Sequence, residues 1–419
     1  MSNPSRPARP PHPLLAVLLP FAGGYFVSYL FRTVNAVIAP DLVAEFGLQP
    51  WELGLLTSAY FATFALFQIP LGLLLDRFGP RRVNGSLLLV AAAGAALFAL
   101  SGGFPGLFLG RALIGLGVSA CLMSSIKAFV LWFPLKRLPA LTGAIMFSGG
   151  LGALSATAPV EAALALTSWR GVFLGLAALV LLVSAIVFLA VPEVEAPSRH
   201  ESVGEQLRAL AGIFRSRQFW QVSAVAMLTQ STFMSIQGLW AGPWMRDVAA
   251  LDRSGVAERL LLLALSTMTG ALLFGNVASW LAGRGVAPVR VFKAGLAGAM
   301  LAQLAIIAGP GPWSAWAWLC YGLFIASGTL GYSVLSQHFP PHLAGRANTA
   351  HNLLVFVCAF ASQWAIGAVI NLWPVLNGHY HPEGYRVAFA LFLALQALAW
   401  TWFVVDQARA GRLGAARQA

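Results

Sequence analysis

Residues 72–82 read GLLLDRFGPRR, a charged turn that lies between two long apolar runs. A weaker copy, SWLAGRGVAPVRV, lies in the second half of the chain and aligns Arg77 with Arg284, 207 residues later. A second pair of segments, WFPLKRLPA and HFPPHLAGRA, repeats with an offset of 206 residues when Phe133 is laid on Phe339. Two landmarks with one period, in a chain of 419 residues, indicate a duplicated membrane protein whose halves repeat in parallel.

The composition excludes a water-soluble protein. Charged residues make up 10% of the chain and hydrophobic residues 58%, whereas a soluble domain has about 25% charged residues. The net charge of +12 would suggest a nucleic-acid partner in a soluble protein. Here the basic residues fall in short loops, where membrane orientation explains them, and we expect no nucleic-acid partner. The three cysteines have no metal-ligand spacing, so we expect neither a metal nor another cofactor.

Twelve apolar runs are long enough to cross a bilayer as helices, which need roughly 20 residues each. They lie near 14–38, 53–75, 83–101, 107–132, 140–162, 171–191, 219–245, 260–281, 289–308, 314–337, 347–371 and 387–405. The sequence therefore predicts an all-α integral membrane protein with twelve transmembrane helices in two pseudo-symmetric halves of six. The expected domains are a disordered tail 1–13, a half 14–191, a linker 192–218 with a short amphipathic helix, a half 219–405 and a tail 406–419.

The loop charges predict the orientation. With the amino terminus inside, 18 Lys and Arg fall in inside loops and tails and 5 in outside loops, with 3 more in spans. Because positive charge accumulates on the cytoplasmic side, we expect both termini in the cytoplasm. The preference for Arg over Lys and the richness in Ala, Leu and Gly favour a bacterial inner membrane. We expect a monomer in the lipid bilayer.

The charged turn resembles the signature of the major facilitator superfamily, Gly-x-x-x-Asp-Arg-x-Gly-x-Arg-Arg after the second helix. The matching residues are Gly72, Asp76, Arg77, Gly79, Arg81 and Arg82. Arg111, followed by Gly115 and Gly117, is similar to a weaker fourth-helix motif of that family. The resemblance covers almost the whole chain and implies the family's fold of two six-helix halves.

We expect the residues of both motifs to control conformational change. Asp76 ends the second helix and could accept bonds from the amino end of a neighbouring helix, where the dipole favours an anion. Arg77, Arg81 and Arg82 can pair with carboxylates or lipid phosphates. The alternative is that the basic residues form a solvated loop on the positive inside face.

The first helix contains the strongest candidate for substrate binding. In GYFVSYLFRTVNAVIAP, Tyr25, Tyr29 and Arg32 share one face, with Asn35 beside them. Charges inside a membrane are costly, at least ~2.5 kcal/mol at a helix centre, and usually face a cavity. The run resembles the first helix of the anion:cation symporters and the organophosphate:phosphate antiporters, which implies that Arg32 binds a carboxylate or phosphate. The alternative is that Arg32 snorkels to the interface or pairs with another span.

Three further residues are candidates for substrate contact. Lys127 lies inside the span that ends with Trp-Phe-Pro, where the resemblance implies a basic residue. No acidic residue lies in the middle of a span, so an anionic substrate would balance Arg32 and Lys127. Gln230 and Gln237 are seven residues apart and could share a helix face toward a ligand. They could equally bond to neighbouring helices.

The chain departs from the symporter pattern at positions that matter for coupling. Phe31 stands where an Asp is often found before the first-helix Arg, and Val118 where a fourth-helix Glu is expected. Asp41, Glu161 or His351 could carry a coupling proton instead, so proton coupling stays open.

The sequence predicts a secondary active transporter that moves a small organic anion, with a carboxylate favoured, by alternating access. The rival interpretations are an exporter of amphipathic compounds and a transporter-like membrane sensor. We expect no enzyme, because no nucleophile-base pattern, paired intramembrane carboxylates or phosphate loop is present.

Overall fold

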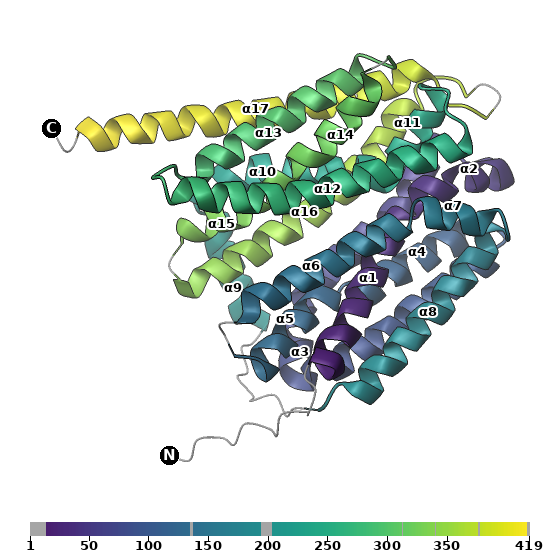
Figure 1. Ribbon diagram of the computed structural model, residues 1–419, viewed down its shortest axis with the longest axis horizontal. Helices are drawn as coiled ribbons and strands as arrows, with labels where there is room; N and C mark the ends of the chain where they lie inside the picture. The colour runs from purple at the N-terminus through teal and green to yellow at the C-terminus, as the bar shows by residue number, and fades with distance from the viewer. Residues whose placement is uncertain are drawn as a thin grey trace. The chain divides into compact units, whose positions relative to one another are not determined.

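Figure 1 shows the computed structural model of the chain. The structure describes residues 14–134, 137–193, 203–311, 313–339, 341–375 and 378–416. The expected tail 1–13 and residues 194–202 of the expected linker lie outside the described residues. Contacts divide the chain into two compact units, which we call unit 1 (residues 1–34 and 59–203) and unit 2 (residues 35–58 and 204–419).

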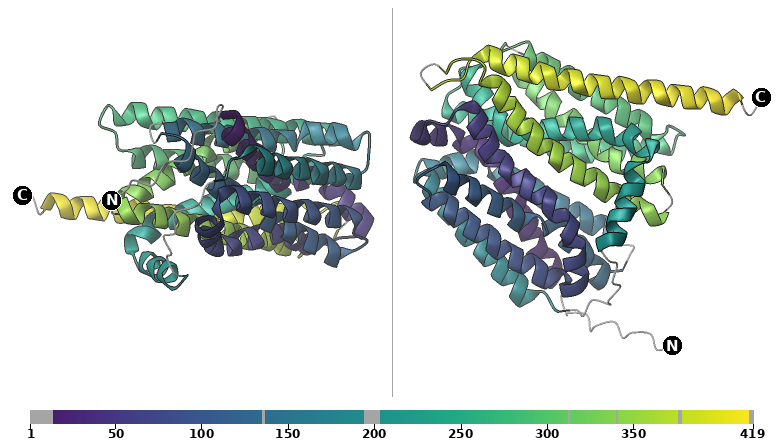
Figure 2. Two further views of the ribbon diagram at one scale, coloured as in Figure 1. Left: turned by 90° about the horizontal axis from the view of Figure 1, so that it is seen from below. Right: turned by 180° about the vertical axis from the view of Figure 1, so that it is seen from behind.

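The described part of unit 1 is a bundle of helices that lie side by side (Figures 1 and 2). Its helices are η1 (Leu14–Leu18), α1 (Leu19–Thr33), the part of α3 (Pro50–Leu100) beyond residue 58, α4 (Phe104–Val118), α5 (Cys121–Trp132), α6 (Leu138–Ser155), α7 (Ala158–Leu164) and α8 (Trp169–Ala190). Helix α1 contacts α4, α5, α6 and α8, so the first helix is largely enclosed by its neighbours.

The described part of unit 2 is likewise built of helices. It contains α2 (Asn35–Phe46), the start of α3, α9 (Val203–Phe214), α10 (Arg217–Ser235), the π-helix η3 (Ile236–Trp240), α11 (Ala241–Asp247), α12 (Arg253–Ala282), α13 (Pro288–Ile307), α14 (Ser314–Ile325), the 3₁₀-helix η4 (Ala326–Thr329), α15 (Leu330–Gln337), α16 (Pro341–Ile370) and α17 (Pro382–Ala416). Helix α10 packs against α16 and α17, and α14 packs against α12 and α13. Helix α9 lies in the expected linker.

Ten helical segments in the described part of the chain are long and apolar enough to cross a membrane. They coincide with ten of the twelve predicted spans. The other two predicted spans, 53–75 and 219–245, are helical as well: the first is part of α3, and the second consists of α10, η3 and α11. The sequence of α10, RQFWQVSAVAMLTQSTFMS, contains many polar side chains, and polar residues lower the apolar character of a span.

The charged turn at residues 72–82 contains the one break in α3. Gly79 has φ 76° and ψ 163°, a backbone conformation that favours glycine, and it separates the predicted second and third spans. In the weaker copy, Gly285 has φ 80° and directly follows Arg284, which is the residue aligned with Arg77. Both copies therefore interrupt the helix with a left-handed glycine close to the aligned arginine.

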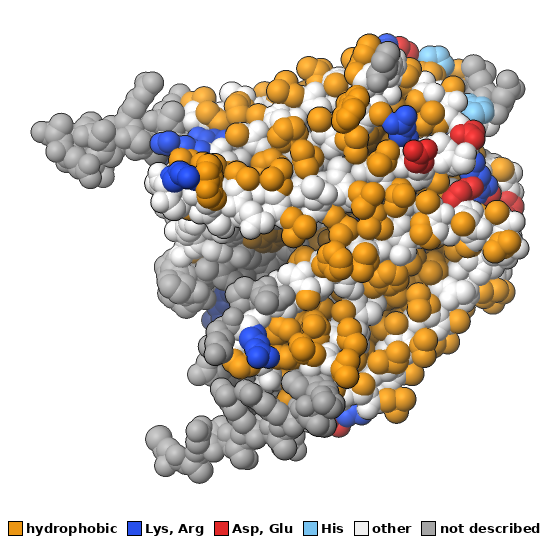
Figure 3. Space-filling model, in the orientation of Figure 1, with side chains coloured by type: hydrophobic (Ala, Val, Ile, Leu, Met, Phe, Trp, Pro, Cys, Tyr) orange, Lys and Arg blue, Asp and Glu red, His pale blue; other side chains and the backbone are white. Residues whose placement is uncertain are grey.

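The exterior of the helices is apolar. Figure 3 shows hydrophobic side chains over the visible faces, with Lys, Arg, Asp and Glu toward the helix ends. Leu272 and Trp280 on α12 and Phe147 on α6 are among the large apolar residues that are more than half exposed. A bilayer solvates such faces, whereas water would not.

Candidate functional site

The Arg32 side chain lies in an aromatic environment within unit 1. Its guanidinium carbon is 4.4 Å from the centroid of the Tyr29 ring and 5.7 Å from that of Phe64. The guanidinium also interacts with the hydroxyl of Tyr60. The rings of Tyr25 and Tyr29 meet edge to face at 5.0 Å. A cation over aromatic faces is attracted by the ring quadrupoles, which helps to hold the charge within the membrane span.

Helix α6 makes room for the two tyrosines. A Cβ at Gly149 would lie 2.7 Å from the Tyr25 ring and 3.0 Å from the Tyr29 ring. A Cβ at Gly152 would lie 2.1 Å from the carbonyl oxygen of Phe26, so α1 and α6 are in backbone contact there. These glycines permit the close approach that small residues give in membrane bundles.

Arg111 is buried on α4, with 1% of its surface exposed. Both of its terminal nitrogens donate to the carbonyl oxygen of Phe31 at 3.2 Å, and its guanidinium carbon lies 5.4 Å from the Tyr60 ring centroid. Arg32 and Arg111 therefore share Tyr60 as a neighbour.

The other candidates of the first half lie elsewhere in the structure. Asn35 is buried at the start of α2, which follows α1 after the single residue Val34, itself with helical backbone angles. Lys127 is half-buried on α5, a helix that packs against α1 and α6.

The two candidate glutamines of unit 2, Gln230 and Gln237, lie in different helical elements. The Nε2 of Gln230 donates to the carbonyl of Gly328 at 2.9 Å, which ties α10 to η4. Gln237 is half-buried in η3, a single π-helical turn. Such turns inside α-helices occur frequently at functional sites.

A polar cluster, which we call the His351 cluster, joins α15 and α16. The hydroxyl of Tyr332 donates to Oδ1 of Asn352 at 3.0 Å, and the rings of Tyr332 and His351 lie 5.1 Å apart. Asn348 donates to the hydroxyl of Ser336 at 2.9 Å. His351 is 1% exposed, and neither ring nitrogen has a hydrogen-bond partner in the described part of the chain. Buried polar atoms of this kind are rare and call for a water or ligand.

Residues 35–58 dock closely onto the rest of unit 2, and three glycines allow it. A Cβ at Gly242 would lie 2.1 Å from the carbonyl oxygen of Ala36, and one at Gly367 would lie 2.4 Å from that of Pro50. A Cβ at Gly54 would lie 2.8 Å from the carbonyl oxygen of Gln363. The segment therefore packs backbone to backbone against α11 and α16.

Polar contacts secure the same segment. Arg253 donates to both carboxylate oxygens of Asp41, at 3.0 and 2.7 Å. Gln363 donates to the hydroxyl of Thr57 at 2.5 Å. Arg253 begins α12, whose first turn is capped by Asp252. Hydrogen bonds from the Ser254 hydroxyl and the Gly255 amide lower the pKa of the Asp252 carboxyl below its ordinary value of 3.8.

A buried carboxylate, that of Asp247, also lies in unit 2. Asp247 has no exposed side-chain surface and accepts from Arg246 at 2.6 Å, His379 at 2.9 Å and the Tyr385 hydroxyl at 2.7 Å. The amide of Tyr380 donates to it at 3.1 Å. Four donors from two chain segments explain why this charge tolerates burial.

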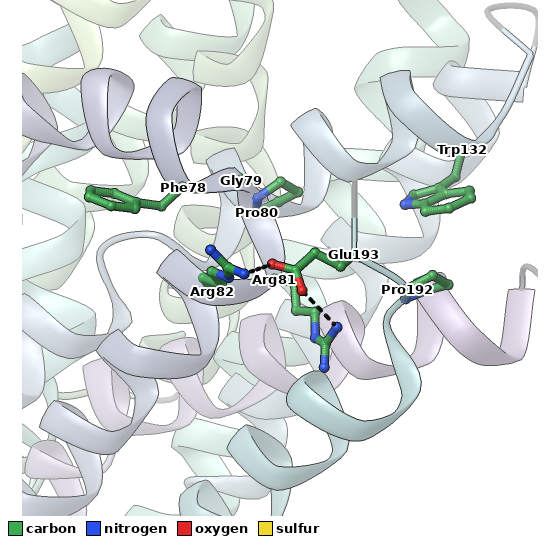
Figure 4. Close-up of a pocket in the computed structure, with 8 residues that line it drawn as sticks. All are labelled: Phe78, Gly79, Pro80, Arg81, Arg82, Trp132, Pro192 and Glu193. Atoms are coloured by element: carbon green, nitrogen blue, oxygen red, sulfur yellow. Dashed lines mark ion pairs between the residues drawn. The ribbon is translucent and has the colours of Figure 1, made fainter. Parts of the chain in front are cut away.

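Residues of the charged signature line a small, shallow pocket in unit 1 (Figure 4). Arg81 lies 3.7 Å from the carboxylate of Glu193, and Arg82 contacts the same carboxylate. Phe78, Pro80, Trp132 and Pro192 form its apolar walls. Arg77 and Gly79 are described, but the side chain of Asp76 lies outside the described side chains. The basic residues thus engage the end of the sixth span.

Sequence reasoning missed Tyr60 and Phe64 beside Arg32. The segment YFATF places these two rings four residues apart on one helix face, which was the available signal. It also missed the Phe31 carbonyl as the acceptor for Arg111, because a backbone acceptor leaves no trace in residue identities.

Known proteins similar to this chain are transporters. The chain is 22% identical over 268 residues to the hexuronate transporter of Escherichia coli (strain K12), an alignment that spans 60% of this chain and 62% of that protein's length, less than two thirds. It is 22% identical over 373 residues to the probable L-galactonate transporter of the same strain, covering 82% of this chain and 80% of that protein.

The fold is also that of solved transporters. The structure matches a bacterial homolog to the human lysosomal transporter Spinster, in an inward-facing and unoccupied conformation, with a TM-score of 0.78 and 19% identity, over 94% of this chain and 97% of that one. This likeness confirms the predicted all-helical fold. The family model of the Major Facilitator Superfamily matches residues 21–363. The chain therefore belongs to the major facilitator superfamily and is a multi-pass membrane protein.

Proposed function

We propose that this protein is a secondary active transporter that carries a small organic anion, with a carboxylate favoured, by alternating access. The observation that carries the proposal is Arg32, whose guanidinium lies 4.4 Å from the Tyr29 ring inside the first span. A planar, permanently charged fork suits a carboxylate, which it can grip with two parallel hydrogen bonds. The tyrosine hydroxyls around it supply further polar contacts to a bound anion.

The relatives support a hydroxylated carboxylate as the substrate. Their names refer to hexuronate and L-galactonate, which are both sugar acids. Proton coupling is part of the proposal, with Asp41, Glu161 and His351 as the candidate carriers.

Uptake of labelled D-galacturonate by proteoliposomes tests the function. Arg32→Ala is expected to weaken binding by about 10- to 100-fold, because it removes a charge-assisted hydrogen-bonding group. Arg386→Ala, which removes a half-exposed arginine paired with Glu383, is the matched control. Uptake by Arg32→Ala at the wild-type rate would contradict the anion hypothesis. Preferential transport of an amphipathic cation would favour an exporter, and saturable binding without uptake would favour a sensor.

We also propose a monomer in the bacterial inner membrane with both termini in the cytoplasm. The excess of basic residues on the expected inside loops supports this orientation. In that orientation the docked segment 35–58, with the Asp41–Arg253 pair, closes the outer end of unit 2. A reporter fused to the carboxyl terminus and active only in the cytoplasm would test the orientation, and a reporter active only outside would overturn it.

The charged signature would then control the inner end. Arg81 and Arg82 hold Glu193 at the end of the sixth span, and this contact supports a role in conformational change. The fourth-helix motif predicts a gating role for Arg111 too, but the contacts of Arg111 are with Phe31 and Tyr60.

A further inference from the structure

Arg111 is the most deeply buried arginine in the part of the chain that the structure describes, and the proposed binding of the substrate by Arg32 gives it no role. It has 1% of its surface exposed on α4, and burial of a guanidinium is unfavourable unless it is hydrogen-bonded. Its two terminal nitrogens converge on one backbone oxygen, that of Phe31, at 3.2 Å each. Both terminal nitrogens of Arg111 therefore donate to a single backbone carbonyl.

The Phe31 carbonyl lies near the end of α1, one residue before Arg32. Phe31 belongs to the last turn of this helix, which ends at Thr33. The carbonyls at the end of a helix carry the negative pole of its dipole, so a cation is favourable there. Val34 is also the last residue of this stretch that belongs to unit 1. Arg111 thus holds α1 where the chain leaves unit 1.

Helix α4 gives Arg111 a rigid base. A Cβ at Gly115 would lie 2.2 Å from the carbonyl oxygen of Tyr60, so α4 and α3 are in backbone contact. The hydroxyl of Thr63 on α3 donates to the carbonyl of Ala112 at 2.7 Å. The backbone of α4 just after Arg111 is therefore held against α3.

Tyr60 links the two arginines. Its hydroxyl donates to the carbonyl of Ser28 on α1 at 3.1 Å and interacts with the Arg32 guanidinium. Its ring lies beside the guanidinium of Arg111, 5.4 Å from the centroid to the guanidinium carbon. The last turn of α1 is thus held at Ser28 by Tyr60 and at Phe31 by Arg111.

We propose that Arg111 is a positioning residue for Arg32. By binding the Phe31 carbonyl and packing on Tyr60, it fixes the last turn of α1 and thereby the direction in which Arg32 presents its two N–H donors. This inference rests on the proposed function, in which Arg32 binds the carboxylate. It assigns to Arg111 no contact with the substrate.

The test compares Arg111→Lys and Arg111→Met with the same changes at Arg170. Arg170 is a matched control, because it also donates to a backbone carbonyl, that of Ser101 at 3.0 Å, and also lies over a ring, that of Trp169 at 4.3 Å. The probe is D-galacturonate, and its dissociation constant is measured on purified full-length protein. Size-exclusion profiles show that each variant is folded.

The Arg111 variants are expected to raise the dissociation constant about 10-fold, and the Arg170 variants less than about 2-fold. When Arg32 is already replaced by Ala, adding Arg111→Met should raise the dissociation constant by less than a further factor of about 2. The reason is that no Arg32 guanidinium is left to position. If the double variant instead raises the dissociation constant by the product of the two single effects, Arg111 contacts the anion independently of Arg32, and the proposal is overturned. An unchanged dissociation constant in the Arg111 variants would overturn it as well.

A second measurement needs no ligand. Hydrogen exchange of the amides in residues 30–36 should quicken in Arg111→Met and stay at the wild-type rate in Arg170→Met, because only the first loses the clamp on α1. Unchanged exchange in both would overturn the positioning role. If instead Arg32→Ala binds D-galacturonate as the wild type does, the proposed function fails, and the exchange result still decides whether Arg111 holds α1.

Discussion

Arg32 combines a permanent charge with a fixed setting of aromatic rings. Because the Tyr29 and Phe64 rings flank it at 4.4 and 5.7 Å, the guanidinium has few orientations open to it. Restricted orientation lowers the entropy lost when an anion binds. The selectivity of the site should therefore depend on the shape of the cation as well as on its charge.

Arg32→Lys tests that dependence. The charge is kept, but one of the two parallel hydrogen bonds to a carboxylate is lost, so we expect the affinity for D-galacturonate to fall about 10-fold. Titration calorimetry measures the effect. Arg386→Lys serves as a comparison, since it makes the same exchange at a half-exposed arginine that pairs with Glu383. Equal affinity of Arg32→Lys and the wild type would show that only charge matters.

His351 should behave as a functional group and not as a stabilising one. Replacement by Leu removes two buried ring nitrogens that lack hydrogen-bond partners among the described residues. We expect the free energy of unfolding to rise by about 1 kcal/mol or stay unchanged, since an unpaired buried polar atom costs about 1–3 kcal/mol. Transport should fall in the same variant. Thermal unfolding and uptake measured together check the prediction, and a stable variant with wild-type uptake would contradict it.

At the scale of the elements, the docking of residues 35–58 depends on small residues and one ion pair. The close contacts at Gly54, Gly242 and Gly367 are incompatible with a Cβ in the present backbone. The Asp41–Arg253 pair is partly exposed, so its contribution should be modest. Packing should therefore outweigh charge in holding this segment.

Gly367→Ala is expected to loosen the docked segment. The new Cβ would lie 2.4 Å from the Pro50 carbonyl oxygen, and such overpacking costs about 1–3 kcal/mol. To measure this, the three native cysteines are replaced and a cysteine is introduced at the buried Leu239 of η3. Gly367→Ala should raise the rate at which a thiol reagent labels this cysteine about 10-fold. Gly275→Ala on α12, where nothing lies within 4 Å, is the control and should label as slowly as the parent.

Exchanging the charges at Asp41 and Arg253 tests the ion pair. Asp41→Arg and Arg253→Asp alone should speed labelling of the same cysteine by about 2- to 5-fold, as expected for a pair worth up to about 1 kcal/mol. The double variant should return toward the parent rate. Rates that simply multiply in the double variant would show that the two side chains act independently.

At the scale of the whole molecule, the charged signature should affect the rate of the transport cycle. Glu193→Gln removes the carboxylate that Arg81 and Arg82 share. We expect turnover to slow about 2- to 5-fold while KM stays within about 2-fold, since partly exposed pairs are worth up to about 1 kcal/mol. Steady-state uptake kinetics measure both, with Glu383→Gln as the control. A raised KM with unchanged turnover would place Glu193 in substrate binding.

The fold was predictable because its signals are local. The Gly79 turn, its copy at Gly285 and the apolar runs each follow from a few neighbouring residues, and the helices occupy all twelve predicted positions. The surroundings of the candidate site were only partly predictable. The spacing of Tyr25, Tyr29 and Arg32 showed a shared face, but the end of α1 at Thr33 has no proline or glycine to mark it. Contacts such as Arg111 with a backbone carbonyl arise only from tertiary packing.

The assignment of residues 35–58 to unit 2 has a consequence for dividing the gene. A fragment that begins at residue 204 would lack the segment against which Gly242 and Gly367 pack, and would leave Trp240 and Gln363 without their covering. A fragment of residues 1–203 would carry that segment away with it. The carboxyl-terminal fragment should therefore fold stably only when both fragments are expressed together, because the amino-terminal one supplies residues 35–58.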